Sequence, residues 1–278
     1  MNNLNTRAIK DNIVKLIIWV SSFITVGILV WILAYVIKNG ISEINIEYLT
    51  TAPHGEEGGI FPMIISTIYI VLLSVIISTP IGVCAAIYLV EYAKPGKIVR
   101  LIRFATESLA GIPSIIFGLF GFIFFVTILK FGFSIIAGAI TLSIMVLPTI
   151  VRTTEEALKS VPNSYREGSL ALGTSKLRTI IKVVLPSAIP GILTAVILSV
   201  GRVVGETAAV YFTAGMGRGI PTSFKESGMT LSVHLYVLAK EGISFNKAYA
   251  TATILVIIVA LINLSANRIA SRFRKTNP

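Results

Sequence analysis

Apolar residues form six long runs along the chain, separated by shorter polar segments. The runs cover residues 14–37, 62–90, 113–130, 133–151, 187–213 and 247–268. A helix needs about 20 apolar residues to cross the hydrocarbon layer of a membrane, so each run predicts a spanning helix. The runs lack the alternating pattern of barrel strands, and a chain in lipid can otherwise satisfy its backbone only as helix. The sequence therefore predicts an all-α polytopic membrane protein with six transmembrane helices.

Composition and charge agree with this prediction. Hydrophobic residues make up 54% of the chain and charged residues only 13%, which is too apolar for an ordinary water-soluble domain. The net charge of +11 comes from basic residues at the ends of the apolar runs, not from a compact basic face that would bind nucleic acid. Most Lys and Arg residues lie on the same side as both termini, which predicts that both termini are cytoplasmic.

The predicted spans divide the chain into four parts. These are a cytoplasmic N-terminal tail (residues 1–13), a first transmembrane helix (14–37), a transmembrane core (62–270) with a cytoplasmic loop (153–186), and a cytoplasmic C-terminal tail (271–278). Within the core, residues 97–109 carry charges on one helical face and apolar residues on the other. This segment predicts an amphipathic helix that lies at the cytoplasmic surface of the membrane.

Two opposite charges, Arg202 and Glu206, interrupt the fifth run. A charged side chain at bilayer depth costs about 3 kcal/mol, so such a pair usually faces protein or an aqueous path instead of lipid. Side chains four residues apart on a helix can bridge each other. Gly201 and Gly205 form a small-xxx-small pattern that predicts close packing against another helix. Two interpretations stay open: a structural ion pair, or a transport site at which the planar Arg side chain binds an oxyanion.

The cytoplasmic loop carries the start and stop signals of short helices. Capping boxes, each a hydroxyl and a carboxylate three residues apart, occur at Thr153 with Glu156 and at Ser164 with Glu167. Pro162 separates the two predicted helices, the second of which covers residues 165–172 and ends at Gly173; a third begins at Thr174 or Ser175. The loop therefore predicts a helix, a glycine turn and a helix.

This compact projection has two interpretations. Tyr165, Leu170 and Leu172 are predicted to be exposed, which suits docking into a groove of a partner protein. A solvated connector with ordinary caps explains the same spacing.

No catalytic, cofactor or metal site is predicted in the chain itself. The glycine-rich loop that cradles ATP phosphates is absent, Cys84 is the only cysteine, and the two histidines lie far apart in the sequence. A transporter without its own motor depends on an ion gradient or on a partner. Because Arg202 and Glu206 are essentially the only ionisable groups inside the spans, we expect a partner motor.

The loop resembles a family motif. Glu167-Gly168-Ser169, then Gly173, then Val183-Val184-Leu185-Pro186 match the spacing of the EAA motif of ABC-importer permeases, with small residues in place of two alanines and Val183 in place of isoleucine. The resemblance implies a type I ABC-importer permease (MetI-like) fold whose loop inserts into a separate ATPase subunit. It assigns this coupling to Tyr165, Glu167, Gly168, Ser169, Leu170, Leu172 and Gly173.

Within that family the chain is similar to the phosphate permease subunits, PstA. The similar stretches are residues 58–70, 80–93, 107–121, 171–192 and 201–210. The resemblance implies a PstC-like permease partner, two PstB-like ATPase subunits that bind ATP and Mg, a PstS-like phosphate-binding protein, and the cytoplasmic membrane of a bacterium or archaeon. It also implies that Arg202 and Glu206 serve phosphate translocation. A permease for molybdate or sulfate, and an ion-coupled secondary carrier, are the alternative interpretations.

Overall fold

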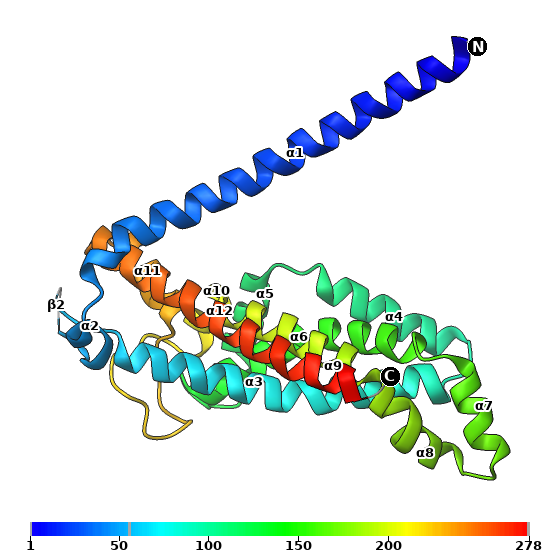
Figure 1. The fold of residues 1–278 in the computed structure, drawn as a ribbon. Coiled ribbons are helices and arrows are strands. Elements are labelled where there is room, and N and C mark those ends of the chain that lie inside the picture. The colour runs from blue at the N-terminus through cyan, green and yellow to red at the C-terminus, as the bar shows by residue number, and fades with distance from the viewer. Residues whose placement is uncertain (1, 55–56, 277–278) are drawn as a thin grey trace.

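The computed structural model describes residues 2–54 and 57–276, which are almost entirely helical (Figure 1). The long helices are α1 (Asn2–Gly40), α3 (Phe61–Ile87), α6 (Ile135–Lys159), α9 (Leu185–Val204) and α12 (Phe245–Thr276). The shorter α-helices are α2 (Ile46–Thr50), α4 (Lys97–Ala110), α5 (Ser114–Gly121), α7 (Asn163–Ala171), α8 (Lys176–Thr179), α10 (Ala208–Thr213) and α11 (Leu231–Lys240). A 3-10 turn η1 (Ile41–Glu43), three π-helical segments η2 (Tyr88–Tyr92), η3 (Phe122–Ile128) and η4 (Ile180–Val184), and a small hairpin of β1 (Pro53–His54) and β2 (Glu57–Gly58) complete the described chain.

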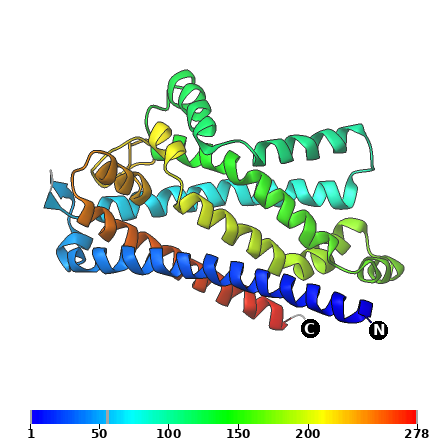
Figure 2. The same cartoon turned by 90° about the horizontal axis from the view of Figure 1, so that it is seen from above.

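Five helical runs are long and apolar enough to cross a membrane, which confirms the all-helical membrane fold. A sixth span exists if α4 and the run α5–η3 are counted together, but the two parts are bent by 100°. The helix predicted at 97–109 is present as α4, which runs alongside α6 in both views (Figure 2). Its location at the cytoplasmic surface of the membrane stays a prediction.

Several helices extend beyond the predicted spans or stop short of them. Helix α1 already begins at Asn2, so the described part of the predicted N-terminal tail is helical. Helix α6 continues to Lys159, beyond the predicted end at residue 151, and pairs of opposite charges four residues apart, such as Arg152 with Glu156, support the extra turns. The fifth span runs without interruption from Lys176 to Val204 and then stops.

The core lies between α3 and α6, and α6 is the most buried of the spanning helices. Polar contacts join the pair: the Ser74 hydroxyl donates to the Ala139 carbonyl (3.2 Å), and the Ser143 hydroxyl donates to the Ser74 carbonyl (3.0 Å). A Cβ on Gly82 would lie 2.6 Å from Ile150 Cγ2. Small residues and hydroxyls therefore allow these helices to approach closely, as in other membrane bundles.

Helix α1 stands apart from the bundle and is exposed along its apolar length (Figure 1). It contacts α12 near its C-terminal end, where the rings of Tyr35 and Tyr249 meet edge to face at 5.8 Å and Thr253 donates to the Val36 carbonyl. The two ends of the bundle differ. Helices α7 and α8 form one end, hereafter the loop end, and α10, α11 and the hairpin lie at the other (Figure 1).

We expect Gly82→Ala to lower the thermal stability of the detergent-solubilised protein. The added methyl group meets Ile150, a β-branched and fully buried residue that has no room to move, and overpacking of this kind costs about 1–3 kcal/mol. Gly27→Ala on α1 is the matched control, because nothing lies within 4 Å of its Cβ position. Equal unfolding temperatures for the two variants would contradict the close packing of α3 and α6.

Candidate functional site

Arg202 lies in the last turn of α9, at the end of the long run that begins at Lys176. Its side chain is partly buried, and its guanidinium makes no hydrogen bond or ion pair with any residue that the structure describes. A positive charge at a helix C-terminus is favoured by the helix dipole, which lowers the cost of keeping it there. The guanidinium is therefore available to a ligand or to another chain.

Glu206 is not on α9 but in the break between α9 and α10. Its Oε1 atom accepts a hydrogen bond from the Ala209 amide (3.1 Å) at the start of α10. Its carbonyl accepts from the Ser232 hydroxyl of α11 (2.8 Å), and its own amide donates to the Val203 carbonyl (3.2 Å). The Glu206 side chain thus accepts from a backbone amide that would otherwise lack a partner where the helix is interrupted.

The predicted ion pair between Arg202 and Glu206 is not present in the described chain. The prediction assumed one helix through both residues, whereas α9 ends at Val204 and Gly205 follows as its cap. Gly205 has a right-handed backbone (φ −82°), so its conformation does not itself require glycine, and the carboxylate of Glu206 is used by the start of α10.

No other described helix of this chain comes close to the face formed by Gly201 and Gly205. No described atom outside its own helix lies within 4 Å of a Cβ on Gly201, and for Gly205 the nearest such atom is the Gly201 carbonyl oxygen at 3.7 Å. The glycine face beside Arg202 is therefore open. Contact of this face with a second chain stays a prediction.

Helix α11 packs beside the break. The Leu231 amide at its start donates to the Thr67 hydroxyl of α3 (3.0 Å). Burial of His234 and the positive charges of Arg218 and Lys247 together lower its pKa to about 4, so His234 is neutral at neutral pH. Within residues 2–54 and 57–276, no three His, Cys, Asp or Glu side chains are placed to hold a metal ion.

The loop end has the predicted order of helix, glycine turn and helix. Pro162 lies between α6 and α7, Gly173 has a φ of +80°, and Ser175 caps α8 by accepting from the Arg178 amide. Only glycine adopts this left-handed backbone without strain. Helix α8 continues through η4 into α9, so the turn is joined directly to the helix that carries Arg202.

Both predicted capping boxes of the loop are wrong. Thr153 lies inside α6, where the helix continues without a new start, and Ser164 lies inside α7, whose first residue is Asn163. Helix α7 begins at Asn163, directly after Pro162. Pro162 occupies the N-cap position, and no side chain caps the helix.

The structure divides the predicted coupling residues into two groups. Tyr165, Leu170 and Leu172 are exposed, Leu172 to 86%, and Glu167 and Gly168 are exposed with them. Ser169 instead faces the turn, where its hydroxyl lies 2.8 Å from that of Thr174 and 2.9 Å from that of Thr179. The exposed residues form a surface, and Ser169 stabilises the turn beside it.

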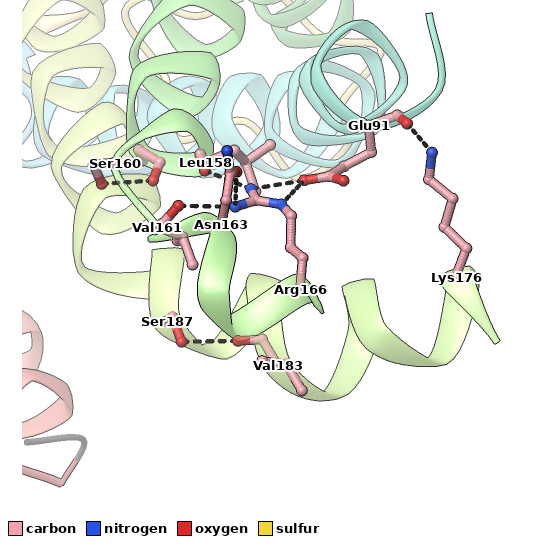
Figure 3. A network of polar contacts seen from close by, with 10 residues as sticks. Glu91, Leu158, Ser160, Val161, Asn163, Arg166, Lys176, Val183 and Ser187 are labelled. Atoms are coloured by element: carbon pink, nitrogen blue, oxygen red, sulfur yellow. Dashed lines mark hydrogen bonds and ion pairs between the residues drawn. The ribbon is translucent and has the colours of Figure 1, made fainter. Parts of the chain in front are cut away.

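Figure 3 shows a contact that the sequence analysis missed. Arg166 of α7 binds the Glu91 carboxylate on η2, with Nη2 at 2.8 Å and Nε at 3.0 Å from Oε1. The same guanidinium donates to the carbonyls of Leu158 and Val161, both at 2.8 Å. The Leu158 carbonyl lies in the last turn of α6 and also accepts from the Val161 amide (3.4 Å), and the Val161 carbonyl lies just beyond the helix end. The one sequence signal for this contact is the position of Glu91, an acidic residue at the end of an apolar run.

A cavity of about 420 Å³ lies between α4 and α6 at the loop end. Glu155 lies at this cavity, is largely buried, and pairs with both Arg103 of α4 (3.3 Å) and Lys159 (2.9 Å). Acidic and basic groups are balanced around the cavity, so it offers no excess charge for an ion. Its ion pairs explain why α4 lies along α6.

Comparisons with known proteins agree on one family. The family model described as "Binding-protein-dependent transport system inner membrane component" matches residues 78–276. The chain is 35% identical to a probable ABC transporter permease protein, YqgI, of Bacillus subtilis, over 97% of this chain and 98% of that protein. It is 36% identical to the phosphate transport system permease protein PstA of Haemophilus influenzae, over 88% of each chain.

Solved structures support the fold alone. The MetNI methionine ABC transporter in an inward-facing conformation matches with a TM-score of 0.62 and 23% identity, over 75% of this chain and 93% of that one. A bacterial alginate ABC transporter matches with a TM-score of 0.65 and 13% identity, over 91% and 94%. Both share the helical arrangement described above.

We expect Glu206→Ala to destabilise the folded protein by about 1 kcal/mol, since the Ala209 amide loses its cap. Glu206→Gln is the matched control, because its side-chain oxygen can still accept this bond. Thermal unfolding in detergent measures both. If the Gln variant loses as much stability as the Ala variant, the negative charge matters more than the cap.

Proposed function

The chain belongs to the family of binding-protein-dependent transport system inner membrane components, and we propose that it forms one half of the membrane pathway of an ATP-driven phosphate importer. The spanning helices and the family support a permease subunit. The substrate is inferred from relatives that are phosphate permeases and cover most of this chain. The observation that carries the proposal is the unpartnered guanidinium of Arg202 at the end of a spanning helix.

Arg202 has the chemistry that a passing phosphate needs. Its planar fork matches the oxygens of a tetrahedral anion, and charge-assisted bonds of this kind are strong. Transport also requires release, because a site that binds too tightly holds its ion. Arg202 is only partly buried and lies beside an open glycine face, so water and a second chain can reach the bound anion. Glu206, one turn away, keeps a negative charge near the site.

The open surfaces suit the partners that the proposal requires. A homologous, PstC-like permease packs against the face of Gly201 and Gly205 and completes the pathway. Two PstB-like ATPases bind ATP and Mg, and one docks on the exposed surface of α7, while a PstS-like protein delivers phosphate at the α11 end. The chain lies in the cytoplasmic membrane of a bacterium or archaeon, with both termini and α7 on the cytoplasmic side.

Reconstitution tests the proposed function. The chain is placed in vesicles with the homologous permease, the ATPase and the binding protein, and uptake of labelled phosphate, sulfate and molybdate is measured with and without ATP. We expect ATP-dependent uptake of phosphate only. Uptake of sulfate or molybdate would show that phosphate is not the only substrate. Uptake driven by an ion gradient without ATP would contradict the whole proposal.

Arg202→Gln tests the proposed site within that assembly. We expect normal co-purification of all subunits but phosphate uptake lowered by about 10- to 100-fold, the effect of losing hydrogen bonds to a charged group. Arg218→Gln is the control, since Arg218 lies at the same end and is exposed. Normal uptake by the Arg202 variant would contradict its role, and loss of assembly would favour a structural one.

Gly173→Leu tests the docking loop. A leucine at a φ of +80° is strained by about 1–2 kcal/mol, so we expect a distorted turn, loss of the ATPase on purification, and loss of phosphate-stimulated ATP hydrolysis. Gly173→Asn is the matched control, because asparagine tolerates this backbone. Retained coupling in the leucine variant would show that the turn does not position the docking surface.

A further inference from the structure

We propose that Glu91 and Arg166 are positioning residues that fix the docking helix α7 to the ends of α3 and α6, so that force applied to α7 moves both spans. The inference rests on the proposed function, because it takes α7 as the place where the ATPase docks. It assigns a role to two residues that the family motif of the loop does not include.

Arg166 joins three elements at one point. Its guanidinium binds the Glu91 carboxylate, which belongs to the π-helical end of the span begun by α3. It also donates to the carbonyls of Leu158 and Val161, where α6 ends. An Arg fork presents several donors in a fixed plane, so a displacement of α7 pulls on all of these acceptors together.

This contact differs from the other ion pairs of the loop end because both of its side chains are largely buried. The side chains of Arg166 and Glu91 are 16% and 7% exposed, whereas those of Arg152 and Glu156 are 67% and 68% exposed. Exposed pairs exchange with water and hold their partners weakly. A buried pair is costly to break because it leaves an uncompensated charge, so it keeps its geometry under load.

A second contact attaches the other arm of the turn to the same place (Figure 3). Lys176, the first residue of α8, donates to the Glu91 carbonyl, and its Nζ lies 4.9 Å from the ring centroid of Tyr92. Arg166 precedes the turn at Gly173 and Lys176 follows it. Helices α7 and α8, hereafter the docking unit, are thus both attached to η2. Neither helix pivots about Gly173 alone.

The free surface of the unit is where the partner is proposed to dock. Tyr165 and Leu170 are about half exposed on the same helix that buries Arg166. A partner that moves this surface therefore moves Glu91 and the end of α6 with it. Without the anchor, α7 would swing on the connection at Pro162 while the spans stayed in place.

The test compares Glu91→Gln and Arg166→Lys with the matched control Glu156→Gln in the complete reconstituted assembly. Lysine keeps the charge of Arg166 but cannot reach the carboxylate and both carbonyls at once. The first measurement is the amount of phosphate taken up per ATP hydrolysed. We expect this ratio to fall by about tenfold in both anchor variants, while ATP hydrolysis continues and the control stays normal.

Two results of this measurement would overturn the inference. One is an unchanged ratio in the anchor variants. The other is a parallel loss of uptake and hydrolysis, which would mean that the contact only supports the fold.

A second measurement is independent of the substrate. Amide hydrogen exchange in α7 is expected to be faster in Glu91→Gln than in Glu156→Gln, and equal rates would overturn the anchor. If the unmodified assembly takes up no phosphate, the proposed function fails, and the exchange rates still decide whether Glu91 and Arg166 hold α7.

Discussion

Backbone amides and carbonyls find no water inside a lipid layer, so every helix end or break at that depth needs a partner from the chain itself. The break after α9 is a point of this kind, and the end of α6 at the loop end likewise leaves carbonyls that need partners. Glu206 and Ser232 satisfy the backbone at the break after α9, and Arg166 takes up the carbonyls of Leu158 and Val161 at the end of α6. Polar side chains are thus found where the helices stop. The proposed binding and coupling sites lie at these positions.

One uninterrupted helical run connects these two regions. It begins at Lys176, beside the turn at Gly173, and ends at Val204, two residues after Arg202. A helix of this length reaches about 40 Å. In the proposed mechanism, movement of the docking surface is carried to the proposed phosphate site along this run, which includes the π-helical segment η4 and Pro190. The open face of Gly201 and Gly205 is the place where the proposed second permease closes the pathway around that site.

The fold could be predicted because the membrane demands long apolar runs. Four of the six runs each correspond to one long helical run, 113–130 became α5 and η3, and 187–213 is divided between α9 and α10. The turn at Gly173 was also predictable, because glycine favours the left-handed conformation that it adopts there (φ +80°). The Arg202–Glu206 pair was misjudged because spacing alone does not reveal that Gly205 ends α9. The contact of Glu91 with Arg166 joins residues that are 75 positions apart, and no local pattern encodes it. Contacts between distant segments are set by packing, and only the structure describes them.

The central claim is that motion of the docking loop reaches the end of α9 through this helical run. The most direct measurement is the reactivity of a thiol introduced by Gly205→Cys, in a chain whose only cysteine is removed by Cys84→Ser. The assembly is compared with and without nucleotide trapped on the ATPase, in the presence and absence of Gly173→Leu. The account predicts that nucleotide changes the rate of modification and that Gly173→Leu abolishes the change. The same rate with and without nucleotide, or a change that persists when the turn is distorted, would contradict it.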